Sequence, residues 1–503
     1  MGLATVRARA QNGLSADPVN VEVHLTGGLP ALHIVGLPEA AVREAKDRVR
    51  AAIITSGYAF PQRRITINLA PADLPKHGGR FDLAIALGIL LAQGDLPAGC
   101  LEGIEVLGEL SLSGALRPVS GALPAAVAAA QAGHQLLLPE ANLAEAACCP
   151  GISLLPAHHL SAICGGLLGD GLNTVRPPPL SRTNRVHPDL AEVRGQAQAK
   201  RALLVAAAGG HSLLMIGPPG AGKSMLAQRL PGLLPDLDIH DALEVAAIRS
   251  VSSAGFDPTQ WMLRPFRAPH HTSSGVALAG GGGQPRPGEI TLAHHGVLFL
   301  DELPEFPRAV LDVLRQPLES GEIHIARAAS QVRFPARFQL VAAMNPCPCG
   351  YLGDPQRPCR CTPDQVRRYR GRLSGPLLDR IDLQIFVPRA SPSAMLADTP
   401  TNPGGGTVDA RRQVVAARER QNRRQGCANT ALGAEAVRHL AMSAEARTVL
   451  GQALERLALS ARGLHRLIKV AQTLTDLEGG DRIDTPQVAE ALGYRGQDVT
   501  PTR

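Results

Sequence analysis

The sequence predicts a multidomain α/β protein, in which a central parallel α/β domain lies between an N-terminal α+β domain and a C-terminal helical domain. Three observations support this prediction. The chain has 503 residues, which favours about three domains. The stretch GLNTVRPPPLSRTNRV has linker chemistry and separates two differently patterned regions. A strand, a glycine-rich loop and a helix then follow in the order that opens a parallel α/β unit.

The expected domain boundaries follow from changes in pattern along the chain. Short β-like runs, VEVHL, RITINLA and IEVLGEL, alternate with alanine-rich helical stretches such as residues 40–56. A second break, PTNPGGGT, precedes arginine-rich and then leucine-rich helical segments. We therefore expect an α+β domain over 1–168, a linker over 169–187, an α/β core over 188–392, and a basic insertion with a helical domain over 393–503.

Composition excludes several classes of protein. Apolar residues make up 45% and charged residues 19% of the chain, which is ordinary for a globular protein. No stretch approaches 18 uninterrupted apolar residues, and the first residues lack the apolar run of a secretory signal, so we expect a cytoplasmic protein without membrane contact. The net charge of +7 suits a polyanionic partner without identifying one.

The strongest motif is a complete phosphate-binding loop, GPPGAGKS. Residues 190–209 have helical spacing and predict one helix. The apolar strand LLMI then precedes the loop, and the helical segment SMLAQRL follows it. Backbone amides of such a loop surround the phosphates of ATP, Lys223 reaches the terminal phosphates, and Ser224 ligates magnesium. The expected nucleotide-binding residues are Gly217, Pro218, Pro219, Gly220, Ala221, Gly222, Lys223 and Ser224.

A second segment, GVLFLDELPEF, completes the predicted nucleotide site. Residues 297–300 form an apolar strand, and Asp301 and Glu302 follow at its C-terminal end, where open α/β sheets bind ligands. We expect Asp301 to hold magnesium and Glu302 to polarise the attacking water. A solvated turn is the alternative interpretation of two adjacent carboxylates.

The strings VRGQAQAKRAL, RPFRAPHHT, PRPGEITLAHHGVLFLDELPEF and LLDRIDL carry a resemblance to a known family. From Asp189 to Glu478 the chain resembles the magnesium-chelatase-like AAA+ ATPases, and more narrowly the YifB/ComM family. The resemblance implies an AAA+ P-loop core with a C-terminal helical lid. It also implies assembly into a ring, expected to be a hexamer.

The resemblance also assigns roles to individual residues. Asn345, after the apolar strand QLVAAM, matches the sensor 1 position that orients the water. Arg380 resembles the arginine finger that these motors insert into a neighbouring subunit. Arg462 matches sensor 2, with Arg466 as the competing choice. Gln196 lies where family members contact adenine. A surface salt bridge is the alternative for each arginine.

DNA contacts are expected from two loops that in related motors face the central channel. The segment IHIARAASQVRFPARF predicts a hairpin, strands 323–327 and 331–334, which makes Arg327 a candidate phosphate contact. The glycine-rich segment between Arg264 and Glu289 matches the family's helix-2 insertion, so Arg267 and Arg286 are further candidates. An ordinary surface hairpin or loop is the alternative. Basic blocks at 367–372 and 411–424 add to the expected DNA surface.

Four cysteines form two CxC pairs in CPCGYLGDPQRPCRC. Four soft ligands on a turn-rich loop suit tetrahedral zinc, with reduced thiols or redox sensing as the alternatives. The candidate ligands are Cys347, Cys349, Cys359 and Cys361.

The N-terminal region resembles the proteolytic domain of Lon proteases, a ribosomal S5 domain 2-like fold. The resemblance rests on GLPEAAVREAKDRVRAAI, RITINLAPADLPKHGGRFDLAIALGIL and LGELSLSGALRPVSGALPAAVAAAQAGHQLLLPE. The Lon nucleophile would fall near Arg80 and its lysine partner near Leu123, so no Ser–Lys dyad is present. We therefore expect this domain to lack peptidase activity.

Together these features predict an ATPase that translocates or unwinds DNA as a ring. The family resemblance implies branch migration during homologous recombination in natural transformation. Two other functions stay open: a magnesium chelatase motor subunit, and a protein-remodelling AAA+ factor. Expected cofactors are ATP and magnesium, with structural zinc as a further possibility; expected partners are single-stranded or branched DNA and further copies of the chain.

Overall fold

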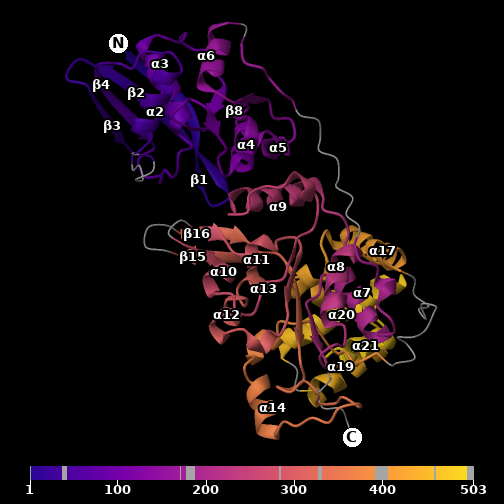
Figure 1. Ribbon diagram of the computed structural model, residues 1–503. Coiled ribbons are helices and arrows are strands. Elements are labelled where there is room, and N and C mark those ends of the chain that lie inside the picture. The colour runs from indigo at the N-terminus through magenta and orange to yellow at the C-terminus, as the bar shows by residue number, and fades with distance from the viewer. Residues whose placement is uncertain are drawn as a thin grey trace. The chain divides into compact units, whose positions relative to one another are not determined.

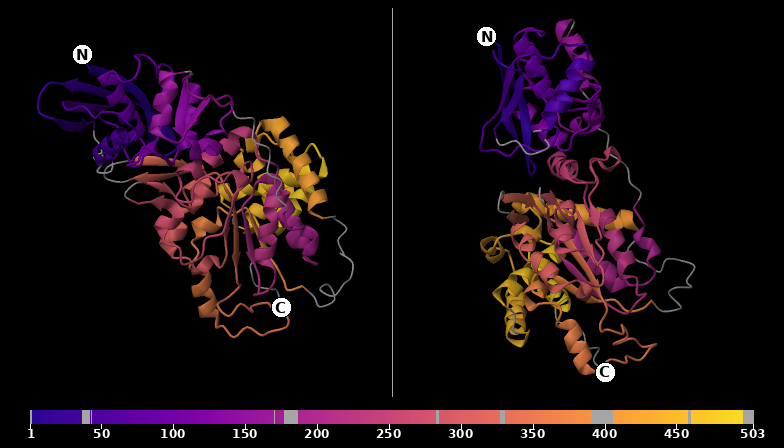
Figure 2. Two further views of the ribbon diagram at one scale, coloured as in Figure 1. Left: turned by 45° about the horizontal axis from the view of Figure 1, so that its top comes forward. Right: turned by 60° about the vertical axis from the view of Figure 1, so that its left-hand side comes forward.

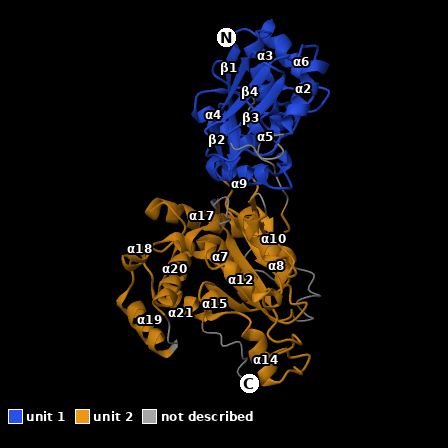
Figure 3. Cartoon of the chain, turned by 90° about the vertical axis from the view of Figure 1, so that its left-hand side faces the viewer, with its two compact units in different colours: residues 1–183, 238–262, 328–332 blue, residues 184–237, 263–327, 333–503 orange. Residues whose placement is uncertain are grey.

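The computed structural model describes residues 2–36, 42, 44–169, 171–176, 187–282, 285–326, 331–390, 406–457 and 460–495. The chain divides into two compact units (Figure 3). Unit 1 comprises Met1–Thr183, Asp238–Met262 and Ala328–Val332, and unit 2 comprises the rest. The segment Asp238–Met262, which the sequence places inside the 188–392 core, therefore groups with unit 1.

Unit 1 is built on a seven-stranded mixed sheet with strand order β3-β4-β2-β1-β5-β8-β9. Alternating burial along β2 fits a strand with one face in the core. β1, β2 and β4 pair antiparallel, and the other neighbouring pairs are parallel. The strands are β1 (Gly2–Asn12), β2 (Ser15–Thr26), β3 (Ala31–Val35), β4 (Arg64–Ala70), β5 (Ile104–Val106), β8 (Gln135–Pro139) and β9 (Leu154–Ala157).

The helices of unit 1 complete its core. Helix α3 is apolar on nearly all sides, so it is buried where it packs against β1 and β2. Helix α9 packs against α4. The helices are α2 (Ala45–Thr55), α3 (Asp82–Gln93), α4 (Ala122–Gln131), α5 (Leu143–Ala146), α6 (Leu160–Leu168) and α9 (Ile239–Val251); β6 (Glu109–Leu110) and β7 (Leu116–Arg117) form a small hairpin.

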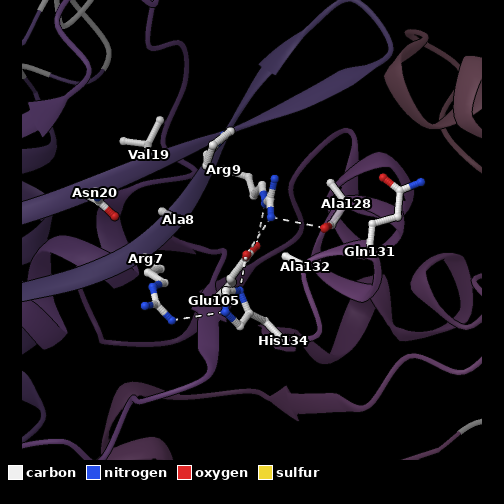
Figure 4. A pocket seen from close by; sticks show the side chains of 11 residues that line it. Arg7, Ala8, Arg9, Val19, Asn20, Glu105, Ala128, Gln131, Ala132 and His134 are labelled. Carbon is white, nitrogen blue, oxygen red and sulfur yellow. Dashed lines mark hydrogen bonds and ion pairs between the residues drawn. The ribbon is translucent and has the colours of Figure 1, made fainter.

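A charged network lines a pocket of about 430 Å3 in unit 1 (Figure 4). Arg9 and Glu105 are both buried and form a two-pronged ion pair, with N–O distances of 2.6 and 2.7 Å. His134 Nδ1 lies 2.8 Å from the same carboxylate. Burial raises the pKa of Glu105, but hydrogen bonds from Arg9 and His134 outweigh burial and hold that pKa below its usual value.

We expect Glu105→Gln to lower the free energy of unfolding of the chain by about 3–5 kcal/mol, because Arg9 would remain buried without a counter-charge. Urea unfolding at pH 7 measures this loss. The matched control is Glu140→Gln, which changes an exposed glutamate and should leave the midpoint unchanged. A Glu105→Gln midpoint equal to that of the control would show that the ion pair contributes nothing to stability.

Unit 2 is built on a five-stranded parallel sheet with strand order β11-β14-β17-β10-β18. Strands β10, β14 and β17 are buried along their whole length, as parallel strands covered on both faces are. The predicted strands LLMI, VLFL and QLVAAM are confirmed with these bounds. The strands are β10 (Leu213–Ile216), β11 (Phe266–Arg267), β14 (Val297–Leu300), β17 (Gln339–Met344) and β18 (Leu383–Phe386).

The C-terminal helices gather beside the first helices of unit 2 in both views of Figure 2. Helix α17 packs against α7, α8 and α20, and α20 packs against α7 and α21 (Figure 1). The helices involved are α7 (Ala197–Gly209), α8 (Lys223–Leu233), α17 (Thr407–Gln425), α18 (Ala434–Arg438), α19 (Ala444–Leu457), α20 (Ala461–Glu478) and α21 (Thr485–Gly493). This arrangement confirms the multidomain α/β class with a parallel core and C-terminal helices.

Shorter elements connect the strands of unit 2. Two of them, β15 and β16, form a two-stranded sheet, as the hairpin prediction requires. They are α10 (Gly275–Ala279), β12 (Gly280–Gly281), β13 (Arg286–Pro287), α11 (Glu289–Leu292), α12 (Arg308–Val313), α13 (Pro317–Ser320), β15 (Glu322–Ala326), β16 (Gln331–Pro335), α14 (Pro363–Arg370) and α15 (Gly375–Leu378).

One predicted helix begins later than the sequence pattern indicates. Residues 190–209 have continuous helical spacing, but α7 begins only at Ala197. Gly195 and Gln196 have φ angles of 63° and 56°, in the left-handed region that interrupts a right-handed helix. The prediction of one helix over 190–209 is therefore wrong, because side-chain spacing carries no information about this backbone turn.

Candidate functional site

Three neighbouring strands of unit 2 bring the predicted nucleotide-site residues to one edge of the sheet. The loop 217–222 follows β10, Asp301 follows β14, and Asn345 follows β17. Since β14, β17 and β10 are adjacent and parallel, all three segments emerge at the C-terminal edge. This edge is where open α/β sheets bind ligands.

The backbone of the loop requires glycine for two reasons. A Cβ atom at Gly217 would lie 2.1 Å from the carbonyl oxygen of Val387, so only glycine permits this close approach. Gly220 and Gly222 have φ angles of 76° and 88°, which favour glycine. Helix α8 begins directly after Gly222, so its free N–H groups and positive dipole end lie at the loop, as an anion site requires.

Lys223 is buried beneath the loop. Its Nζ donates to the carbonyl oxygens of Gly217 and Pro218, at 2.7 and 3.0 Å, and to Oδ1 of Asn345 at 3.2 Å. Burial lowers the pKa of Lys223 to about 8, although the charges of Asp301 and Glu302 act in the opposite direction. The ammonium group therefore loses its proton at a lower pH than an ordinary lysine does.

We expect ATP affinity to fall about tenfold between pH 7 and pH 9. A lysine with a pKa of about 8 is roughly 90% charged at pH 7 and roughly 10% charged at pH 9, and the phosphates bind the charged form. Equilibrium titration with a fluorescent ATP analogue measures the dissociation constant. The guanidinium of Lys223→Arg stays charged in this range, so that variant should show no such decline. A flat wild-type profile would contradict the assignment.

The side chains of Ser224 and Asp301 are hydrogen-bonded to each other in the site. Ser224 Oγ donates to Asp301 Oδ2 at 2.6 Å, and the backbone N–H of Glu302 donates to Asp301 Oδ1 at 2.9 Å. Glu302 has a φ angle of 52°, a left-handed conformation that is strained for glutamate. The hydroxyl and carboxylate oxygens fit a magnesium ion, which prefers oxygen ligands.

His271 is a residue of this site that sequence reasoning does not connect with the nucleotide; a hydrogen-bonding structural role is favoured for it over metal binding. Its Nδ1 lies 3.1 Å from Oε2 of Glu302. His271 also packs edge-on against Phe306, with ring centroids 6.5 Å apart. The string APHH carried no indication of this contact, because His271 and Glu302 are distant in sequence.

The side chain of Gln196 contacts the phosphate-binding loop. Its Nε2 donates to the carbonyl oxygens of Ala221 and Pro388, at 3.3 and 2.5 Å. The residue immediately precedes α7, with its backbone in the left-handed conformation described above. Gln196 therefore connects the loop to the segment after β18.

Arg380 and Arg462 lie at the opposite edge of the sheet from the loop. Arg380 comes three residues before β18, and its carbonyl oxygen accepts from Oγ of Ser212, which precedes β10. Both arginines contact the same oxygen of Glu319, with N–O distances of 2.5 Å for Arg380 and 3.0 Å for Arg462. The structure thus brings these two predicted residues together, away from the other site residues.

Arg466, the competing sensor 2 choice, has a different environment. Its Nη1 lies 2.9 Å from Oδ1 of the buried Asp382 and also donates to the Arg380 carbonyl oxygen. Burial raises the pKa of Asp382, but His211 and Arg466 outweigh burial and hold that pKa well below its usual range. Arg466 is therefore committed to a buried ion pair, whereas Arg462 is more exposed.

The three candidate DNA contacts differ in what the structure places around them. Arg267 forms a two-pronged ion pair with Glu289, with both N–O distances 2.6 Å, so its guanidinium is already engaged. Arg286 is exposed, on the short strand β13 opposite β12. Arg327 lies outside the described residues.

Part of the basic block on α17 also faces inward. Arg424 forms an ion pair with the buried Asp476, and Arg418 donates to the carbonyl oxygen of Ala207. Burial lowers the pKa of Arg418 to about 10. Arg412 and Arg423 lie on the exposed face of this helix, and each forms an ion pair with an acidic side chain of the same helix.

The four predicted zinc ligands come together on the loop after β17. Their sulfur atoms all lie within 4.8 Å of one another. Sγ of Cys347 is 3.4 Å from that of Cys349 and 3.6 Å from that of Cys359. Four thiolates at about 2.3 Å from a zinc ion would be about 3.8 Å apart. Backbone N–H groups of Cys349 and Cys361 also donate to sulfur atoms, as is usual around thiolate clusters.

The cysteine loop contacts the phosphate-binding loop. Gly350 has a φ angle of 83°, and a Cβ atom there would lie 2.7 Å from Cδ of Pro219. Gly350 therefore satisfies both a left-handed turn and a close approach. The same loop begins two residues after Asn345, so the cysteine cluster and the nucleotide-site residues share one short stretch of chain.

Comparisons with known proteins cover nearly the whole chain. Three family descriptions match: magnesium chelatase, subunit ChlI, over residues 189–395; subunit ChlI of Mg-chelatase, over residues 21–142; and the ChlI C-terminal region, over residues 405–495. The chain is 49% identical to protein YifB of Escherichia coli K12, over 99% of this chain and 98% of that protein. It is 47% identical to competence protein ComM of Haemophilus influenzae, over 98% of each.

A more distant match is limited to part of the chain. The magnesium-chelatase 38 kDa subunit of Rhodobacter capsulatus is 30% identical over 33% of this chain and 52% of that subunit. In the part of the chain that the structure describes, none of the helices has the length and apolar character needed to cross a membrane.

Proposed function

Because the chain belongs to the YifB and ComM family of magnesium-chelatase-like proteins, we propose that it is an ATP-driven, ring-forming DNA translocase or helicase. In this proposal it promotes branch migration in homologous recombination during natural transformation, in the cytoplasm. The full-length similarity to a protein named for competence supports the biological setting. AAA+ ATPase activity is the part best supported by the chain's own residues.

The observation that carries the ATPase proposal is the convergence of three strand ends on the phosphate-binding loop. Lys223 would hold the terminal phosphates, and Ser224 with Asp301 would hold magnesium, which screens phosphate charge when bound. Glu302 would polarise the attacking water and Asn345 would orient it. Gln196, beside the loop, would contribute to the adenine pocket.

The position of Arg380 supports assembly into a ring, proposed to be a hexamer. A four-residue strand such as β10 spans about 13 Å, and the phosphate-binding loop lies at its far end from Arg380. A catalytic arginine at this edge can reach only a phosphate held by another subunit. Arg462 shares the same carboxylate and would act at the same neighbouring site.

Unit 1 is proposed to be a Lon-like domain without peptidase activity. Arg80, near the place that resembles the nucleophile position, is buried, and burial lowers its pKa to about 10. Its guanidinium donates to Gln11 and to the carbonyl oxygen of Ser120. A buried arginine cannot act as a hydroxyl nucleophile, so the structure around it favours a non-proteolytic role.

We also propose that the cysteine cluster holds structural zinc, because four sulfur atoms lie at nearly tetrahedral separations. The expected result is one zinc per chain in metal analysis of purified protein. Cys349→Ser should lose most of that zinc, since three thiolates hold the ion less well than four. The control Cys427→Ser changes a cysteine outside the cluster and should keep it. Equal zinc content in both variants would contradict the site.

DNA is the proposed substrate because exposed arginines of unit 2 suit a contact that follows the DNA backbone. Arg286, Arg412 and Arg423 are exposed, and Arg327 is the last residue of the first strand in the predicted hairpin. Such contacts recognise phosphate without reading sequence and weaken as salt increases. Arg267 would contact DNA only after leaving Glu289.

The proposal is tested by measuring ATP hydrolysis with single-stranded DNA, duplex DNA, a four-way junction, casein, and magnesium with a porphyrin. Stimulation by DNA that falls as salt rises from 50 to 200 mM is expected. Stimulation by casein alone would favour protein remodelling. ATP-dependent insertion of magnesium into the porphyrin, once partner subunits are added, would favour the chelatase alternative.

A further inference from the structure

Glu319, on the short helix α13, bridges the two arginines proposed to act on the neighbouring subunit. Its Oε1 lies 2.5 Å from Nη2 of Arg380 and 3.0 Å from Nη2 of Arg462. The three residues come from different parts of unit 2: α13, the turn before β18, and the first turn of α20. One carboxylate thus keeps two like charges together that would otherwise repel.

Arg380 is held inside the subunit by these contacts. Its side chain is only 10% exposed, and its Nη1 donates to the carbonyl oxygen of Pro376 at 2.6 Å. Both terminal nitrogens are thus engaged within the subunit, so Arg380 must leave Glu319 before its Nη2 can donate to a phosphate. Arg462, with a side chain 56% exposed, is less tightly enclosed.

We propose that Glu319 is a holding carboxylate, which competes with the neighbouring subunit's terminal phosphate for Arg380 and Arg462. The inference rests on the proposed role of Arg380 at the neighbour's site. A phosphate carries more charge than a carboxylate and can accept two-pronged hydrogen bonds from a guanidinium, so it can displace Glu319 when ATP is bound to the neighbouring subunit. Until then, Glu319 keeps both arginines withdrawn and slows hydrolysis.

Glu319 is a positioning residue in this account, because it acts through Arg380 and Arg462 and not on the reacting phosphate itself. A merely structural Glu319 would hold α13 and α20 in place, and its removal would lower stability and activity together. A holding Glu319 predicts the opposite change in activity: its neutralisation should speed hydrolysis at the neighbouring site. The direction of the change therefore separates the two roles.

The test uses mixed rings in which the two halves of each active site come from different subunits. Acceptor subunits carry Arg380→Ala and keep an intact phosphate-binding loop. Donor subunits carry Glu302→Gln and keep intact arginines. Donors are mixed in excess with acceptors at fixed total concentration, so that hydrolysis occurs at acceptor sites next to donor arginines. Glu319→Gln is then added to the donor only.

Turnover with the Glu319→Gln donor should exceed that with the plain donor by about two- to fivefold. This is the change in an equilibrium constant expected when one partly exposed ion pair is lost. Glu319→Asp, which keeps the carboxylate, should show a smaller increase. Glu478→Gln on the donor is the matched control, since Glu478 is similarly exposed and contacts Arg201 at 3.3 Å, and it should cause no change. Ring assembly of each donor is checked by size-exclusion chromatography.

Three outcomes separate the possibilities. Faster turnover with the Glu319→Gln donor supports the holding role. Restored hydrolysis that Glu319→Gln leaves equal or reduces overturns the holding role while keeping Arg380 as a residue that acts on the neighbour. Mixed rings in which the plain donor restores no hydrolysis overturn the proposed role of Arg380, and with it this inference.

Discussion

Rings made only of Arg380→Ala subunits are expected to hydrolyse ATP about 10³- to 10⁵-fold more slowly than wild-type rings, the range that arginine fingers contribute in related phosphoryl transfers. Mixing them with Glu302→Gln subunits, which are themselves inactive, should restore measurable hydrolysis. Restoration follows because an intact phosphate-binding loop on one subunit then meets an intact arginine on the next. Steady-state phosphate release at several mixing ratios measures it.

The geometry behind this expectation is the separation of the two halves of the site. The loop lies at the C-terminal edge of the parallel sheet, and Arg380 lies at the N-terminal edge, hydrogen-bonded to Ser212 before β10. An arginine that acted within its own subunit would give no restoration on mixing. Retained activity in Arg380→Ala rings would instead show that the arginine is only a partner of Glu319.

Glu302→Gln is expected to lower the turnover number about 10²- to 10⁴-fold, the contribution of a general base, while ATP affinity stays near the wild-type value. Glutamine has nearly the same shape, and the backbone hydrogen bond from residue 302 to Asp301 does not involve the side chain. Phosphate release gives the turnover number, and binding of a fluorescent ATP analogue gives the affinity.

The matched control for this variant is Glu305→Gln, which lies three residues further along and contacts Arg372 at the surface. We expect Glu305→Gln to keep wild-type turnover. If Glu302→Gln kept more than a tenth of the activity, another group would have to polarise the water. A parallel loss of affinity would indicate a disturbed site.

The parallel core and its nucleotide site could be predicted because their signals are local. The core strands β10, β14 and β17 are short, fully buried runs of mainly apolar residues, and Asp301 directly follows β14. The phosphate-binding loop is likewise a contiguous string whose chemistry depends on its own backbone. Spacing alone was therefore enough to place Lys223, Ser224 and Asp301 together.

Features that depend on contacts between distant segments could not be predicted. Nothing near Glu319 in the sequence indicates that it contacts Arg380 and Arg462. Nor does any local sequence feature indicate the contact of His271 with Glu302. The ion pair of Arg267 with Glu289 was missed for the same reason. An arginine count cannot tell a guanidinium that faces solvent from one that is already paired within the fold.

The central claim, that ATP hydrolysis drives movement on DNA, is tested most directly with a labelled synthetic four-way junction whose arms can migrate. With wild-type protein and ATP, the junction should resolve into two duplex products, and with Glu302→Gln or without ATP it should stay intact although protein is bound. If wild-type protein hydrolyses ATP in the presence of the junction but leaves it intact, ATP hydrolysis does not drive branch migration and the proposed function is wrong.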